Sequence, residues 1–598
     1  MSSVLSRGAR VRIPTPALID VTIATLAVLL IASPVLLTSD GFAPDFTNEL
    51  WLAGYQQHVI AAHLHPTLFL QTQRLGVFYP LFAFYGGTLF ALTGALGVVL
   101  GGSTTLAFEA AILAAIAAAY GGLFWLARQL GVRGVLAHAP AIVFVTSAYY
   151  ISDLYGKGAW AEFTAVSMLP LVLAASLRLV RGRLSVWPVA CLVAASAVFS
   201  GSHNITLLWG TTVAVVALGV YWLVSGGSRE LPWRRMLAVA SLIALGVGLN
   251  GWFLLPDLGY AHDANISSTV IPWSATRDYD TFAEIFDPFR MRPSEAEMPG
   301  LYVQAPVLAL VWGLLAAPLS WRYRRLRAGV ATALIVLAGL LVLIMSSGAW
   351  SSLPTPFQRA QFPHRLQTYV TLACVGLVLV GALALTRRAQ SGRATRADRP
   401  LAFGLGLVVA FSVAVCAWQL WAATTHISDP HFSSYSNRAR ALSGVSTLVV
   451  PESWNAGTDY GDRSLPVVPT TAQFTFDPTH AQDNRLAESV SVPPGLQPFS
   501  TNIAGGPYLV HIGGGVRVVG RTFAQQGCIT GCWEGSNLVL QRTTDGSQPV
   551  PVELRARPSA PVVLGRITTA LSAALLLALA VVAAVRRQRR RSAAHPTS

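Results

Sequence analysis

Long apolar runs alternate with short polar turns over most of the chain. Each run has about 20 residues, enough for one helix to cross a hydrocarbon layer of ~30 Å. The pattern therefore predicts membrane-spanning helices. Thirteen such runs occur, near residues 17–38, 79–100, 105–127, 134–151, 164–180, 185–201, 204–224, 235–256, 302–320, 328–346, 365–386, 401–423 and 561–585.

The segment between the last two runs has a different pattern. Residues 424–560 are rich in Pro, Gly, Asp, Thr and Ser, and they contain short β-type stretches such as "STLVV" and "SNLVLQR" between turn signals. We predict a small β-rich domain of ordinary size here. Residues 1–423 are then the polytopic membrane domain, and residues 561–598 are a final transmembrane helix with a basic tail.

Composition agrees with this division. The chain has 53% hydrophobic and only 12% charged residues, which excludes a soluble globular protein. Its net charge of +15 would suggest a nucleic-acid partner in a soluble protein, but here the arginines lie in short clusters between apolar runs. We interpret them as topology signals and expect no nucleic acid. Lys157 is the only lysine, and such a preference for arginine is typical of a GC-rich genome, as in an actinobacterium.

The arginine clusters predict the orientation of the chain. The first run follows Arg7, Arg10 and Arg12 and has no cleavage site after it, so it is expected to be a retained helix with a cytoplasmic N-terminus. If every later run crossed, all later arginine clusters would lie outside. If residues 79–100 instead form a re-entrant or surface segment, which their glycine pair and nearby proline favour, those clusters all become cytoplasmic. We therefore predict about twelve spans in the plasma membrane, with both termini cytoplasmic.

This orientation places the polar loops on the extracytoplasmic side. Residues 39–104 form the first external loop, where the amphipathic stretch "FTNELWLAGYQQHVIAAHLHP" predicts a helix along the membrane interface. Cys528 and Cys532 lie in the external β-rich domain, where an oxidising compartment permits a disulfide. A metal site at these cysteines is disfavoured because no second Cys or His pair accompanies them at zinc spacing.

Ionisable and amide side chains gather at the predicted outer ends of several helices. Each has an ordinary explanation as a solvated boundary residue; His203 or His364 could snorkel, and Asp40 beside Gly41 suits a turn. Polar groups at this depth are expensive, however, and several separate loops carry them, so together they predict a site. The residues are Asp40, Asp45, Glu49, Asp153, Lys157, Glu162, His203, Asn204, Arg359, Gln361, His364 and Arg365.

Four motifs resemble those of a known family. They are the first-loop acidic residue Asp45 followed by "FYPLFAFYGG", then "LYGKGAWAEF" at Leu154–Phe163, "SHN" at Ser202–Asn204 and "QFPHR" at Gln361–Arg365. Over roughly residues 15–425 the chain is similar to bacterial polytopic GT-C-type glycosyltransferases. The resemblance is to the integral-membrane branch named 6-pyruvoyl-tetrahydropterin-synthase-related, akin to YfhO-like proteins.

This resemblance implies a GT-C-like, all-α polytopic membrane fold, with the small β-rich domain outside. It also implies a transferase that uses a polyprenyl-phosphate-linked sugar donor, with an essential first-loop aspartate that maps onto Asp45. The sequence departs from the family pattern at Lys157, where arginine is expected, and at His364, where an aromatic residue is usual. Lys157 keeps the positive charge but lacks the planar fork of a guanidinium group.

Transfer from a lipid phosphate to a hydroxyl group makes two chemical demands. A base must take the proton of the acceptor, and Asp45 is the natural choice. Positive charge must stand where the departing phosphate develops its own, which Lys157 and Arg365 can supply, with Arg74 or Arg359 in reserve. The acceptor is expected to be an envelope glycan, lipid or protein. We predict that the donor and acceptor are bound by Glu49, Arg74, Lys157, Glu162, His203, Asn204, Arg359, Gln361 and Arg365.

Cofactor use and the class of function leave alternatives open. The sequence has no glycine-rich phosphate loop, so no nucleotide is expected and no cofactor is required. A divalent metal, Mg²⁺ or Mn²⁺, stays open because Asp40, Asp45 and Glu49 could supply oxygen ligands. A transporter or flippase of a lipid-linked substrate would need charges inside the spans, where Glu109 is the main example, and paired half-sequences, which we do not detect. The third alternative is a non-catalytic envelope scaffold.

Overall fold

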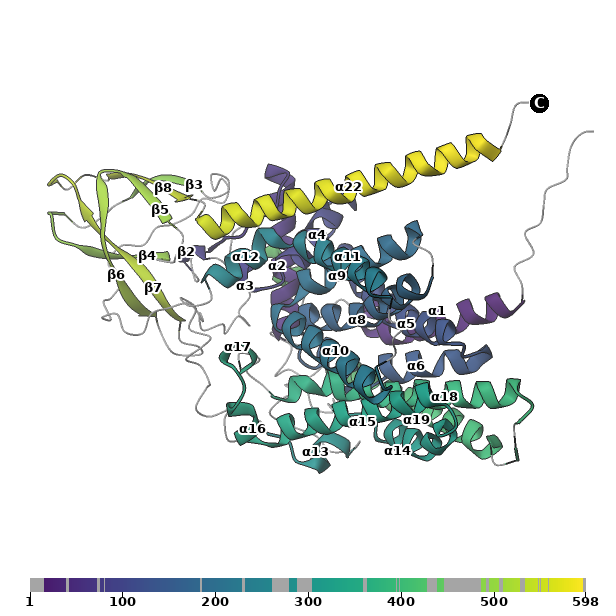
Figure 1. The fold of residues 1–598 in the computed structure, drawn as a ribbon. Helices are drawn as coiled ribbons and strands as arrows, with labels where there is room; N and C mark the ends of the chain where they lie inside the picture. Colours follow the sequence, from purple (N-terminus) through teal and green to yellow (C-terminus); the bar gives the residue numbers. More distant parts are fainter. Residues whose placement is uncertain are drawn as a thin grey trace, which may run out of the picture.

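Helices form most of the described chain (Figure 1). The computed structural model describes residues 15–38, 42, 44–72, 76–79, 81–182, 185–227, 232–260, 279–287, 304–358, 363–393, 395–396, 398–426, 438–445, 485–490, 494–504, 509–526, 533–546, 548, 550–557 and 559–594.

The helices follow the apolar runs of the sequence. Their bounds are α1 Thr15–Leu37, α2 Pro44–His63, α3 Leu81–Phe84, α4 Gly87–Val99, α5 Thr104–Leu130, η1 Gly134–Ala137, α6 Ala139–Val145, α7 Ala148–Tyr155, α8 Trp160–Arg181, α9 Val186–Ser202, α10 Asn204–Val224, α11 Trp233–Gly248, α12 Gly251–Tyr260, α13 Phe282–Phe286, α14 Val307–Ala316, η3 Ala317–Ser320, α15 Arg324–Met345, α16 Ser347–Ser351, α17 Thr355–Gln358, η4 Pro363–Leu366, α18 Gln367–Gln390, α19 Asp398–His426, α21 Arg438–Ser443 and α22 Ala560–Ala594.

Length and composition identify the helices that can cross a membrane. In the described part of the chain eight helices pass this test, or ten if each of two bent pairs is one span. In the first bent pair, η1 and α6 meet α7 at an angle of 47°. In the second, α11 meets α12 at 78°. Helices α9 and α14 are too short to pass, which explains the difference between ten and the predicted number of about twelve. Helix α4, also short, covers the run predicted not to cross. The predicted polytopic, mainly helical fold class is confirmed.

Helix α2 is buried more completely than the sequence suggests. An interfacial helix would keep one polar face exposed, but Phe46, Thr47 and every residue from Glu49 to Gln56 are buried. Gln56 lies inside and donates through Nε2 to the carbonyl oxygen of Thr67 at 2.7 Å. Helices α4, α5 and α21 pack against α2 and cover the face that would otherwise meet lipid or water.

The turn between α3 and α4 lies against the turn between α9 and α10. Gly86 has a φ of +42°, and a Cβ atom there would come within 2.3 Å of the carbonyl oxygen of Ser202. Only glycine fits both the left-handed backbone and this close approach. The Nδ2 atom of Asn204 also donates to the carbonyl oxygen of Phe84 at 3.3 Å. The run predicted to be re-entrant is therefore joined to the "SHN" motif.

In the part of the chain that the structure describes, eight strands form two small sheets. One sheet has the order β1-β2-β4-β7-β6 and the other β3-β8-β5. The first two strands come from the first loop, and Val77 of β2 pairs in parallel with Ile503 of β4. The sequence did not predict this contribution of the first loop to the β-rich part. The strand bounds are β1 Leu70–Thr72, β2 Gly76–Tyr79, β3 Arg485–Val490, β4 Phe499–Ala504, β5 Leu509–Gly514, β6 Val516–Gln526, β7 Trp533–Arg542 and β8 Val550–Arg557.

The strands gather at one end of the helix bundle, beside the start of α22 (Figure 1). The beginning of α1 and the end of α22 lie at the other end of the bundle (Figure 1). The described start and finish of the chain are thus on the same side, opposite to the sheets.

Candidate active site

The corner between α7 and α8 carries the "LYGKGAWAEF" motif. Gly158 in this corner has a φ of +75°, and a Cβ atom there would lie 2.4 Å from the backbone nitrogen of Phe46. The corner thus needs glycine for its left-handed backbone and for its contact with the first turn of α2. This packing places Lys157 beside the first loop, and α8 begins directly after the corner with Glu162 in its first turn.

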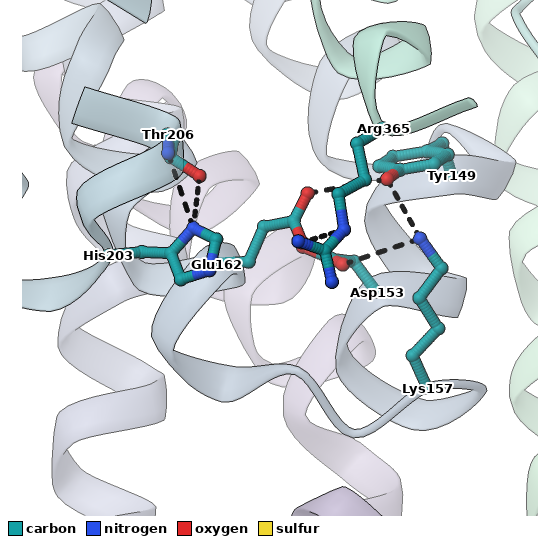
Figure 2. Close-up of polar contacts among 7 residues, drawn as sticks. All are labelled: Tyr149, Asp153, Lys157, Glu162, His203, Thr206 and Arg365. Atoms are coloured by element: carbon teal, nitrogen blue, oxygen red, sulfur yellow. Dashed lines mark hydrogen bonds and ion pairs between the residues drawn. The ribbon is translucent and has the colours of Figure 1, made fainter. Parts of the chain in front are cut away.

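Lys157 and Glu162 are joined through Tyr149 of α7. The Lys157 ammonium donates to the Tyr149 hydroxyl at 2.8 Å, and that hydroxyl donates to Oε1 of Glu162 at 3.4 Å (Figure 2). The Nζ atom of Lys157 also lies 3.9 Å from Oδ1 of Asp153, one helical turn after Tyr149. Two carboxylates, a phenol and an ammonium group therefore share one buried cluster.

Arg365 brings a second cation to this cluster from η4, the short turn that leads into α18. Its Nε atom is 3.5 Å from Oε2 of Glu162 (Figure 2). The side chain of Glu162 is 4% exposed and that of Asp153 3%, while Lys157 and Arg365 are 14% and 18% exposed. Carboxylates this deeply buried need cations beside them, which Lys157 and Arg365 supply. The two cations keep some exposure, so a ligand can reach them.

His203 approaches the cluster from the turn between α9 and α10. Its Nδ1 atom accepts from the backbone N–H of Thr206 at 3.3 Å and lies 2.7 Å from the Thr206 hydroxyl (Figure 2). Burial lowers the pKa of His203 to about 4, although the negative charge of Glu162 acts in the opposite direction. His203 is therefore neutral at neutral pH, with Nδ1 occupied as an acceptor and the proton on Nε2.

This pKa predicts that acid destabilises the protein through His203. Between pH 6.5 and 4 the unfolded chain binds a proton on this histidine that the folded chain does not. The contribution of neutral His203 to the free energy of unfolding is thus fully present above pH 6.5. It is lost as the pH falls towards 4, and the loss is about 3 kcal/mol at most. We expect the melting temperature in detergent to fall between pH 6.5 and 4.5 by less in His203→Gln than in the wild type. An equal fall in both proteins would show that His203 titrates normally.

Glu49 connects the first loop to the cluster. Its Oε2 atom accepts from the backbone N–H of Ala161 at 2.8 Å, so a carboxylate of α2 satisfies a free amide in the first turn of α8. Burial raises the pKa of Glu49 well above its usual range, and the charge of Asp45 raises it further. Asp45 itself is exposed in the first turn of α2, where a negative charge is favourable at a helix N-terminus.

The structure brings several of the predicted site residues together and separates one. Lys157, Glu162, His203 and Arg365 converge, with Glu49 beside them, and the exposed Asp45 lies one helical turn before Glu49. Asn204 instead donates to Oδ2 of Asp257 at 2.8 Å, so its side chain contacts α12. Several residues lie outside the described residues: Asp40, Arg74, Arg359, Gln361, Cys528 and Cys532.

Sequence reasoning missed two tyrosines. Tyr149 was hidden in an apolar run, although its spacing of four from Asp153 places both on one helix face. Tyr85 precedes the Gly86 turn, and its ring centroid is 6.3 Å from that of His203. The "FYGG" stretch predicts a turn, but the sequence does not indicate that Tyr85 packs beside His203. Among the residues that the structure describes, no three His, Cys, Asp or Glu side chains form a group that could hold a metal ion.

Comparisons with known proteins give partial structural likenesses. No protein-family model matches the chain, and no curated protein matches it. The arabinofuranosyltransferase AftD from Mycobacteria aligns over 71% of this chain at 19% identity and a TM-score of 0.42. The chain spans only 27% of that protein's length. ArnT from Cupriavidus metallidurans, solved with undecaprenyl phosphate bound, aligns over 73% of this chain and 81% of its own, at 13% identity and a TM-score of 0.41.

Proposed function

We propose that this multi-pass membrane protein is a glycosyltransferase. It moves a sugar from a polyprenyl-phosphate-linked donor to a cell-envelope acceptor on the extracytoplasmic face, with Asp45 as general base. The observation that carries the proposal is the buried cluster of Lys157, Arg365, Glu162 and Asp153, which stands at the ends of several helices. Asp45 is exposed one helical turn before Glu49, whose carboxylate accepts from the amide of Ala161 beside this cluster. Buried ionisable groups at a membrane boundary are expensive and usually mark a functional site.

The proposed step is a single displacement. The hydroxyl oxygen of the acceptor attacks C1 of the donor sugar, the bond from C1 to the phosphate oxygen breaks, and polyprenyl phosphate leaves. Asp45 takes the hydroxyl proton and returns it to water. Its exposure suits this role, because the acceptor arrives from the aqueous side.

Arg365 and Lys157 are proposed to hold the donor phosphate. The 3.5 Å contact between Arg365 and Glu162 is longer than the roughly 2.7–2.9 Å of a strong charge-assisted hydrogen bond. A phosphate can therefore compete for this guanidinium group. Glu162 would keep Arg365 in place between turnovers, and Tyr149 would do the same for Lys157.

The proposed orientation follows from the arginine clusters and from the arrangement of the bundle. The start of α1 and the end of α22 share one end, and the sheets lie at the other (Figure 1). With the termini cytoplasmic, the β-rich part and the first loop are extracytoplasmic, where nucleotide sugars are absent and a lipid-linked donor is needed.

A transporter or flippase is the second candidate, because the two bent helix pairs resemble the broken helices of transporters. Against it, Glu162 lies in the first turn of α8 and Arg365 just before α18, so the charges stand at helix ends rather than at mid-span. The third candidate, an envelope scaffold, gives no reason for the buried cluster.

Reconstitution separates these functions. The purified chain in liposomes is supplied with polyprenyl-phosphate-linked hexoses and pentoses, labelled in the sugar, and with a membrane extract as the source of acceptor. The transferase releases polyprenyl phosphate and moves label to the acceptor. A flippase moves the labelled lipid between leaflets without cleaving it, and a scaffold does neither.

Lys157 provides a prediction of its own. Lys157→Arg is expected to keep turnover within about threefold because the positive charge is retained, whereas Lys157→Met is expected to lower it by about 10²-fold. Steady-state rates with saturating donor measure both variants. Wild-type rates in Lys157→Met would mean that the ammonium group serves only to neutralise Asp153.

A further inference from the structure

Arg438 is a buried cation from the segment that follows α19, far from the candidate site in sequence. It begins α21, and only 2% of the residue is exposed. Its Nη1 atom donates to Oε1 of Glu109 in α5 at 2.8 Å, and its Nη2 atom donates to the carbonyl oxygen of Val35 at 3.0 Å. That carbonyl belongs to the last turn of α1, where helix carbonyls lack intrahelical partners. One guanidinium group thus joins α1, α5 and α21.

The same guanidinium lies against the first loop. Its carbon atom is 5.9 Å from the ring centroid of Phe42 and 5.6 Å from that of Phe46. Phe46 directly follows Asp45, and its backbone nitrogen is the atom that leaves no room for a side chain at Gly158. Arg438 therefore supports the backbone that holds both Asp45 and the Lys157 corner.

Helix α21 is itself fixed on α2. A Cβ atom at Gly54 would lie 2.9 Å from Leu442 and 3.1 Å from Val445. This close contact holds α21 on α2 at Gly54, about two and a half turns after Asp45. The segment cannot shift without moving the guanidinium away from Phe42 and Phe46.

We propose that Arg438 is a positioning residue that sets the place of Asp45 relative to Lys157, with Glu109 as its counter-ion. This inference rests on the proposed function for its effect on turnover, but its geometric part does not. It also gives a role to Glu109, the main charge within the predicted spans. The segment after α19 is thereby part of the catalytic architecture rather than only a link to the sheets.

The test separates positioning from folding. Arg438→Met alone leaves Glu109, whose side chain is only 20% exposed, without its cation, which is expected to destabilise the fold. Adding Glu109→Gln removes that charge, so we expect the double variant to recover the melting temperature and yield. Because the contacts to Val35, Phe42 and Phe46 stay lost, kcat should remain about 10- to 100-fold low with a donor KM within about threefold of wild type. The matched control is Arg388→Met with Asp398→Asn, another ion pair at 3.0 Å, expected to keep wild-type kcat.

Cysteine labelling tests the geometric part without any activity. In an Asp45→Cys background, labelling by a water-soluble maleimide should be at least about threefold faster with the Glu109→Gln and Arg438→Met pair than with the Arg388 and Asp398 control pair. Unchanged labelling, or a stable double variant with wild-type kcat, would overturn the positioning role. If the wild type transfers no sugar at all, the proposed function fails, and the labelling rates still decide whether Arg438 positions residue 45.

Discussion

Arg365→Ala is expected to lower kcat/KM by about 10³-fold, by weakening donor binding and turnover together. Its proposed ligand, a phosphate, is already charged in the ground state, so loss of the guanidinium affects both. The substitution also leaves Glu162 buried without its nearest cation, which destabilises the fold by roughly 3–5 kcal/mol. The measurement is steady-state transfer with a titration of the lipid-linked donor.

A double variant controls for this loss of stability. Arg365→Ala with Glu162→Gln removes the unpaired charge and should recover the melting temperature, while the donor KM stays high. Arg365→Lys keeps the charge but not the fork, and it should fall between wild type and alanine. A stable double variant with wild-type donor KM would mean that Arg365 serves only to neutralise Glu162.

Asp45→Asn is expected to reduce turnover by roughly 10²–10⁴-fold while donor binding survives. The amide keeps the shape of the side chain but cannot accept the proton of the acceptor. The exposed position of Asp45 makes a large effect on folding unexpected, so the melting temperature should change little. Transfer rates and binding of the labelled donor, measured on the same preparation, separate the two effects.

The other first-loop carboxylates serve as comparisons. Asp40→Asn is expected to be mild if Asp40 only shapes a turn. Glu49→Gln should keep an acceptor for the Ala161 amide and should therefore fold. If Asp45→Asn were fully active while one of these abolished transfer, the base would be another residue of the same loop. If all three variants kept wild-type transfer activity, the loop would not be catalytic, and an envelope scaffold would become the favoured function.

Much of the helical architecture could be predicted because apolar length is a local property. Every apolar run has a helix or a bent pair, and even the run with Gly86 and Gly87 gave the short α4. The bending of α6 against α7, by contrast, has no comparably clear signal in the sequence. The burial of α2 could not be foreseen in full either, because one of the helices that cover it, α21, lies almost 400 residues later.

The candidate site could be predicted in part for the same reason. Polar residues at helix ends, such as Lys157 and Arg365, stand out from an apolar sequence. Their connections do not: Tyr149 joins Lys157 to Glu162 only because α7 and α8 fold back on each other. The partner of Glu109 could not be found either, since Arg438 looks like an ordinary loop arginine until the chain is folded.

The central claim is that the buried cluster holds the phosphate of a lipid-linked sugar. The most direct measurement is an electron cryomicroscopy structure of the chain in nanodiscs with polyprenyl phosphate added. The account predicts density for the phosphate within hydrogen-bond distance of the Arg365 guanidinium and the Lys157 ammonium, with Asp45 facing the same space. Phosphate density bound elsewhere, with the contact between Arg365 and Glu162 unchanged, would contradict it.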